Sequence, residues 1–257
     1  MRRASMIRRP SRKTLIAVLV VLAAGVAAWL LAPRPPAVRG TPLGLFTTLP
    51  LYWNEAADIS AMLDPAAEKH WARGLIEERR DLRPLDVLSP EALAPFADML
   101  IAQPRALAPA ENVALDDWVR AGGHVLLFAD PLLTQHSGFA LGDRRRPMDV
   151  ALLSPILNRW GLSLDIDEAQ PEGEREAQLL GGPFPVDEAG RLALVATAPD
   201  APASCRLLEG GLAADCAIGQ GHALIVADAA LLDSEGAGSG EREAALSRLL
   251  AAAYARD

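Results

Sequence analysis

One short run of the sequence, residues 125–129 (VLLFA), is apolar at every position. A strand with one face in water alternates apolar and polar side chains, whereas a strand without alternation is covered on both faces. Coverage of both faces is typical of a parallel sheet with helices on either side. Residues 124–129 therefore predict a central strand of an α/β protein.

A helical pattern precedes this strand. In residues 109–121, the apolar residues Leu115, Trp118 and Val119 follow i, i+3, i+4 spacing, which places them on one helix face. The Gly-Gly pair at 122–123 favours the left-handed conformation that ends many helices. This pattern predicts an amphipathic helix packed against the sheet.

Short apolar runs alternate with helical patterns over most of the chain, which predicts a mainly parallel sheet flanked by helices. Residues 149–160 predict a helix with Val150, Leu153, Leu157 and Trp160 on one stripe, and residues 241–255 predict the last helix. The expected strands are residues 43–48, 82–88, 98–103, 124–129, 162–166, 192–197 and 222–227.

Two of these strands have nearly the same sequence. Residues 123–130 read GHVLLFAD, and residues 221–228 read GHALIVAD. The likeness predicts two similar parallel strands, each entered from a glycine turn and each leaving the sheet at an aspartate.

Charge is divided unevenly along the chain. Residues 1–40 hold eight basic residues and no acidic one, which leaves 17 basic and 33 acidic residues, a net charge of −16, in residues 41–257. A body this acidic repels phosphate backbones, so nucleic-acid binding is not expected.

Residues 14–32 are free of charge and would span roughly 29 Å as a helix, about one bilayer core. We expect a transmembrane anchor there; a cleaved signal peptide is the alternative, although its apolar region is usually shorter. The basic residues on its amino side predict a cytoplasmic tail at 1–13. A Pro-rich linker at 33–42 and a periplasmic domain at 43–257 would follow, in a single-pass protein of a bacterial inner membrane.

Candidate ligand-binding residues follow from the expected sheet, because open parallel sheets bind ligands at the carboxyl ends of their strands. Residues near those ends are Asp130, Asp228, Thr47, Thr48 and, farther along, His136. The alternative for each aspartate is that it caps the backbone of the turn that follows its strand.

Catalytic and cofactor motifs are missing from the sequence. It holds no G-x-S-x-G elbow, no Walker A loop and no metal-ligand spacing among its four histidines. We therefore expect no enzyme, no cofactor and no metal. The run Arg144-Arg145-Arg146 is interpreted as a solvated loop or, alternatively, as a contact for an anion or a partner.

The two cysteines flank a Gly-Gly pair at equal distances. A hairpin centred on Gly210-Gly211 places Cys205 opposite Cys216. In an oxidising compartment this geometry predicts a cross-strand disulfide in a small β-hairpin insertion.

Residues 112–132 (NVALDDWVRAGGHVLLFADPL), 153–162 (LSPILNRWGL) and 219–228 (GQGHALIVAD) resemble the gliding-motility-type auxiliary domain family of ABC transport systems. The resemblance implies a glutamine amidotransferase-like or flavodoxin-like fold without the catalytic cysteine. It also implies a membrane-anchored, non-enzymatic subunit that works beside an ABC permease and ATPase.

Two other functions fit the same residues. The first is a periplasmic small-molecule or carbohydrate-binding or sensing domain that uses the carboxyl edge of the sheet. The second is a hydrolase with a site built from Asp130, His136 and Asp228.

Overall fold

The computed structural model describes residues 40–53, 55, 69–166, 169–197, 202–234 and 240–256. The expected cytoplasmic tail and the expected anchor at 14–32 lie outside these ranges, as does the linker up to residue 39. Within the described ranges, no helix has the length and apolar character needed to cross a membrane.

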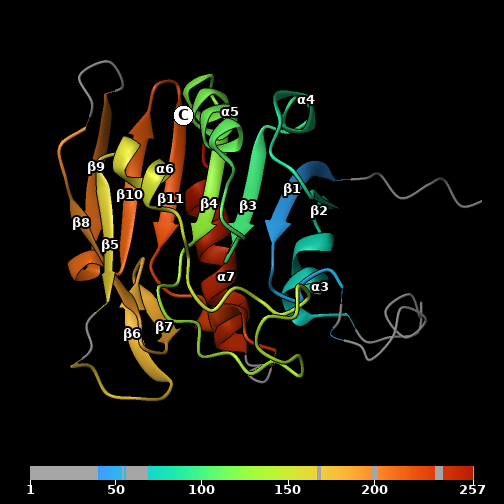
Figure 1. Cartoon of the computed structure of the whole chain (residues 1–257), viewed down its shortest axis with the longest axis vertical. Coiled ribbons are helices and arrows are strands. Elements are labelled where there is room, and N and C mark those ends of the chain that lie inside the picture. The colour runs from blue at the N-terminus through green and yellow to red at the C-terminus, as the bar shows by residue number, and fades with distance from the viewer. Residues whose placement is uncertain are drawn as a thin grey trace, which may run out of the picture. The chain divides into compact units, whose positions relative to one another are not determined.

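A seven-stranded sheet forms the centre of the described domain (Figure 1). Its strand order is β2-β1-β3-β4-β11-β10-β9; the first five strands are parallel, and β10 and β9 are antiparallel to their neighbours. The expected mainly parallel α/β sheet is confirmed. The strands are β1 (Thr41–Thr47), β2 (Arg80–Pro84), β3 (Asp98–Ala102), β4 (His124–Phe128), β9 (Ala203–Leu208), β10 (Ala213–Ile218) and β11 (Gly221–Val226).

Both faces of the sheet are buried. Leu126 and Phe128 of β4 belong to one apolar cluster, and Val125 and Leu127 belong to a second cluster on the opposite face. All four side chains are fully buried, as the run without alternation predicts. The first cluster includes residues of α3 (Trp71–Glu77) and α7 (Gly240–Ala253); the second includes residues of α4 (Pro90–Leu93), α5 (Pro109–Arg120) and α6 (Ser154–Arg159).

The end of α5 depends on its glycines. Gly122 has φ of +112°, which a residue with a side chain rarely adopts. A Cβ on Gly123 would lie 2.5 Å from the indole ring of Trp118, whose Nε1 donates to the carbonyl of Phe96. The glycine pair therefore lets the chain turn directly from the helix into β4.

The two strands of similar sequence are neighbours. β4 and β11 pair in parallel with His124 opposite His222 and Phe128 opposite Val226. Asp130 and Asp228 therefore leave the sheet at adjacent positions on its carboxyl edge.

The helix expected at residues 149–160 is shorter than predicted. It spans Ser154–Arg159, and Val150 is exposed rather than part of a buried stripe. The preceding residues are held in a non-helical segment, because Ala151 donates its N–H to the carbonyl of Asp130 and Leu133 donates to the carbonyl of Asp149. These tertiary hydrogen bonds replace the first turns of the expected helix.

Two small antiparallel sheets lie outside the main sheet. The strands β5 (Leu162–Ile166) and β8 (Gly190–Leu194) pair with each other, and the sequence does not reveal this separate pairing. The hairpin of β6 (Arg175–Leu179) and β7 (Gly182–Val186) was not expected at all. The sequence of β7 contains two prolines, which argue against a strand because proline has no N–H to donate. A two-stranded sheet tolerates them, since each strand has one edge that pairs with no other strand of that sheet.

Cys205 and Cys216 lie opposite each other in the β9–β10 hairpin and are joined by a disulfide. The register is the predicted one, but the turn differs. Leu208 pairs with Ala213, so the loop has four residues and includes the 3₁₀ turn η1 (Glu209–Gly211) instead of a two-residue turn. Cys216 is fully buried in the apolar cluster beside α6.

Reduction of this disulfide should destabilise the domain. Closing a loop of about a dozen residues lowers the free energy of folding by about 3 kcal/mol, because it restricts the unfolded chain. Urea unfolding with and without reductant measures the difference, and a Cys205→Ala, Cys216→Ala double variant should not respond to reductant. An unchanged wild-type midpoint after reduction, with both thiols then open to alkylation, would contradict the expectation.

Candidate functional site

A buried glutamine joins the loops at the carboxyl edge of the sheet. Gln103, directly after β3, is fully buried with φ of +41°. Its Nε2 donates to the carbonyls of Asp130 (3.0 Å) and Met148 (2.9 Å), and its Oε1 accepts from the N–H of Asp130 (3.0 Å). One side chain therefore satisfies three backbone groups from two other segments.

Asp130 is also occupied by backbone groups. Its Oδ1 accepts from the N–H of Leu132 (2.9 Å) and its Oδ2 from the N–H of Ala229 (3.0 Å). The first bond caps the turn after β4, and the second holds the chain that leaves β11. Burial raises the pKa of Asp130 to about 6.

Asp228, shortly after β11, also accepts hydrogen bonds from backbone N–H groups. Its Oδ1 accepts from the N–H of Ala230 (2.6 Å) and its Oδ2 from the N–H of Asp187 (2.8 Å). Burial, together with the nearby charge of Asp130, raises the pKa of Asp228 well above its ordinary value. The structure brings the two aspartates together, but both are fully buried and bind backbone, as the capping alternative describes.

Thr47 and Thr48 line a pocket at the end of β1, although their hydroxyls face backbone partners. Thr47 Oγ1 donates to the carbonyl of Ala102 (2.6 Å). Thr48 Oγ1 donates to the carbonyl of Gln103 and accepts from the N–H of Met148 (3.0 Å). Thr48 therefore joins β1, β3 and the loop before Met148.

The structure does not add His136 to these groups. Its side chain is exposed, and it takes part in none of the hydrogen bonds or ion pairs found among the described residues. In the same part of the chain, no cluster of His, Cys, Asp or Glu has the arrangement of a metal site.

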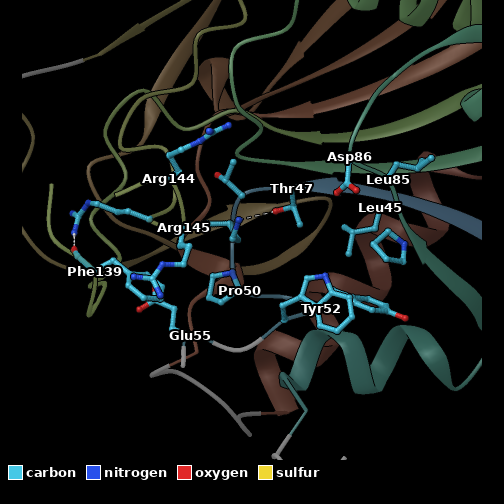
Figure 2. Close-up of a pocket in the computed structure, with 15 residues that line it drawn as sticks. Leu45, Thr47, Pro50, Tyr52, Glu55, Leu85, Asp86, Phe139, Arg144 and Arg145 are labelled. Atoms are coloured by element: carbon cyan, nitrogen blue, oxygen red, sulfur yellow. Dashed lines mark hydrogen bonds between the residues drawn. The ribbon is translucent and has the colours of Figure 1, made fainter. Parts of the chain in front are cut away.

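A pocket of about 250 Å³ lies beside the carboxyl ends of β1 and β2, and we call it the β1 pocket (Figure 2). Its size is near the lower end of small-molecule pockets, which begin at roughly 300 Å³. It is lined by Leu45, Thr47, Thr48, Leu49, Pro50, Tyr52, Trp53, Glu55, Pro84, Leu85, Asp86, Phe139, Arg144, Arg145 and Arg146.

One wall of the β1 pocket carries two aromatic side chains. The rings of Tyr52 and Trp53 meet edge to face, with centroids 5.0 Å apart. The guanidinium of Arg73 lies over the Tyr52 ring, 3.9 Å from its centroid, and this cation–π contact holds the ring in place. Trp53 is 49% exposed, so a large aromatic surface is open to solvent beside the pocket.

The opposite wall is the loop that carries Phe139 and the three arginines (Figure 2). Glu55 holds this loop, because its Oε1 accepts from the hydroxyl of Ser137 (2.6 Å) and its Oε2 from the N–H of Gly138 (2.8 Å). The guanidinium of Arg145 lies over the Phe139 ring, 4.2 Å from its centroid. The loop is therefore fixed against the segment that follows β1.

Some of the expected ligand-binding residues line this pocket and others do not. Thr47, Thr48 and the arginine run belong to the β1 pocket, whereas Asp130, Asp228 and His136 do not line it. The aromatic residues and Glu55 were missed. A usable signal was the Tyr52-Trp53 pair, which follows closely after a strand and would be unusual in a loop without a binding role.

No protein-family model matches the chain, and no curated protein matches it. Solved structures with some similarity include the exo-beta-1,4-mannosidase Op5Man5 from Opitutaceae bacterium strain TAV5, with 16% identity and a TM-score of 0.48 over 95% of this chain. Beta-galactosidases from Bacillus circulans sp. alkalophilus and Rahnella sp. R3 match with 13% identity and TM-scores of 0.43 and 0.44, over 87% and 92% of this chain. The chain spans 40%, 34% and 34% of the lengths of these three proteins.

These findings correct three expectations. The resemblance to the gliding-motility-type auxiliary family is wrong, because no model of that family matches the chain. The expected non-enzymatic ABC-transport subunit, with its permease and ATPase partners, rested on that resemblance and is withdrawn with it. The expectation that the chain is not an enzyme is withdrawn as well, since the similar structures are enzymes and lend it no support.

Replacement of the buried glutamine should destabilise the fold. Gln103→Leu leaves three backbone groups without partners, and each costs about 1–3 kcal/mol, so we expect a loss of at least about 3 kcal/mol in urea unfolding. Gln178→Leu, at an exposed position of β6, is the matched control and should change stability by less than about 0.5 kcal/mol. Similar stabilities for the two variants would contradict this role.

The raised pKa of Asp130 should make stability fall as the pH rises. The folded protein binds this proton more tightly than the unfolded chain does, so the carboxyl's contribution is present below about pH 4 and is lost as the pH passes about 6. The change is on the order of 3 kcal/mol. Asp228 acts in the same direction.

Asp130→Asn should therefore flatten the stability profile between pH 4 and pH 7. It should also lower stability at pH 4, because one amide cannot accept from both the Leu132 and Ala229 N–H groups. Urea unfolding across this range tests the slope, with Asp117→Asn on the exposed side of α5 as the control. A variant that keeps the wild-type slope would show that Asp130 is not the titrating group.

Proposed function

We propose that the described domain binds a small saccharide in the β1 pocket. The observation that carries the proposal is the pairing of an exposed aromatic wall, formed by Tyr52 and Trp53, with a polar wall that contains Glu55 and three arginines. A sugar ring has apolar C–H faces and a rim of hydroxyls. An aromatic face packs against the former, and charged or amide groups hydrogen-bond with the latter.

The position of the pocket supports a binding role. In chain order, the five parallel strands have the arrangement 2-1-3-4-5, and the order reverses at β1. This is the order of flavodoxin-like sheets, and we infer a fold of that type. Such sheets bind ligands outside the carboxyl ends of the strands near the reversal, where the β1 pocket lies.

The pocket walls are held before any ligand arrives. Arg73 holds Tyr52 from one side, and Glu55 and Thr48 hold the loop on the other side. A site with fixed walls loses less conformational entropy on binding than a mobile one. This favours recognition of a small, polar ligand, which can bury little apolar surface.

The location of the domain in the periplasm stays a proposal that rests on the charge division of the sequence.

Binding should stabilise the domain against heat. Neutral monosaccharides and disaccharides of glucose, galactose and mannose are the probes, and a saccharide present at 100 times its Kd should add about 2.7 kcal/mol. Trp53→Ala should weaken binding at least about tenfold, because it removes the exposed aromatic face.

Leu194→Ala is the control for this experiment, because Leu194 is also an exposed apolar residue (56%) but lies on β8, outside the β1 pocket. It should bind like the wild type. The proposal fails if none of the sugars shifts the melting temperature, or if Trp53→Ala responds to them as strongly as the control does.

A further inference from the structure

We infer that the saccharide of the β1 pocket carries an anionic group, a carboxylate or a sulfate or phosphate ester, that pairs with the guanidinium of Arg144. This inference rests on the proposed function, since it names the ligand class for the same pocket. The hydroxyls of a neutral sugar need polar partners but no positive charge, so neutral sugar binding does not account for the charge of the arginine run.

The charge of the pocket runs against the charge of the domain. Residues 41–257 have a net charge of −16, yet residues 144–146 are three consecutive arginines and all three line the β1 pocket. The three arginines outnumber the two acidic lining residues, Glu55 and Asp86, so the lining carries a net charge of +1 in a domain that is otherwise acidic. A positive lining attracts anions.

The second and third arginines of the run already have partners. Arg145 donates from Nε and Nη2 to the carboxylate of Asp143 (3.1 and 2.7 Å). Arg146 donates from Nε and Nη2 to Oδ1 of Asp149 (3.1 and 2.9 Å), and from Nη1 to the carbonyl of Phe139 (3.0 Å). These bonds fix the loop directly after Arg144.

Arg144 differs from the other two arginines. It lines the β1 pocket and is exposed, and it has no hydrogen bond or ion pair with any residue that the structure describes. A guanidinium presents a planar fork of N–H donors that matches two oxygens of one carboxylate, sulfate or phosphate. The anchored loop thus holds one cation free for an anion from solution.

The acidic residues of the pocket leave room for such a group. Both oxygens of Glu55 already accept hydrogen bonds, from Ser137 and Gly138. Asp86 lies across the pocket from Arg144 and Arg145, on the side of Leu45 and Leu85 (Figure 2). A ligand with its anionic group toward Arg144 therefore turns its hydroxyls, rather than its charge, toward Asp86.

Calorimetric titration of the full chain tests the inference. The probes are glucose, galactose and mannose, each compared with its uronic acid and its 6-sulfate. At least one anionic sugar should bind the wild type about tenfold more tightly than its neutral parent, the gain expected from one charge-assisted hydrogen-bonded pair. The gain should shrink in about 0.5 M NaCl, because the pair is exposed. The relative gains of uronate and sulfate identify the kind of anion.

Arg144→Gln should remove this preference, measured as the ratio of the affinities for the anionic sugar and its neutral parent, while Arg144→Lys should keep part of it. Arg206→Gln, at an exposed arginine of β9 far along the sheet, changes the net charge equally and should keep the full preference. Neutral and anionic sugars that bind equally well, or a preference that survives Arg144→Gln, overturn this inference and leave the proposed function intact. Failure of every sugar, neutral ones included, overturns both.

Discussion

The hydrogen bonds at the carboxyl edge of the sheet determine how the rest of the domain is arranged. Parallel strands end together, so the chain must leave the sheet several times in one place, and each exit exposes N–H and C=O groups that need partners. Gln103, Asp130, Asp228 and Thr48 supply those partners from buried or partly buried positions. These bonds hold both ends of the loop that carries the arginines, so they fix the position of that wall of the β1 pocket.

Two buried carboxyl groups of the domain have pKa values that are shifted in opposite directions. Glu111 of α5 accepts from both Nη atoms of Arg105 and from the N–H groups of Leu88 and Ala108. The hydrogen bonds from Arg105 lower the pKa of Glu111 to about 2, so its charge stabilises the fold down to low pH. Asp130 accepts backbone bonds without a cation, and burial dominates its pKa. Glu111 therefore stabilises the fold above its lowered pKa, whereas Asp130 stabilises it below its raised pKa.

The sequence predicts those parts of the fold that depend on local pattern. The apolar run at 125–129 gives a strand buried on both faces, and the equal spacing of Cys205 and Cys216 around a Gly-Gly pair gives their register. Features that depend on distant partners could not be predicted in this way. Residues 149–153 have a helical pattern but bond to the segment after β4, and Gln103 shows its role only when the segments of Asp130 and Met148 are beside it. The same holds for the pocket, where Glu55 meets Ser137 and Gly138 across 82 and 83 positions of sequence.

The two edge strands of the main sheet, β9 and β2, are protected from exchange or pairing with other chains in different ways. Unpaired strand edges invite strands from neighbouring molecules and so promote aggregation. At one end, the disulfide locks the outermost strand β9 to β10, so this hairpin cannot separate and offer its inner edge to an exchanging partner. At the other end, β2 carries Arg80 and Arg83 and ends in Pro84, which has no N–H to donate. The disulfide therefore opposes the exchange of β9 between molecules, and the charges and the proline of β2 oppose the addition of a strand to that edge.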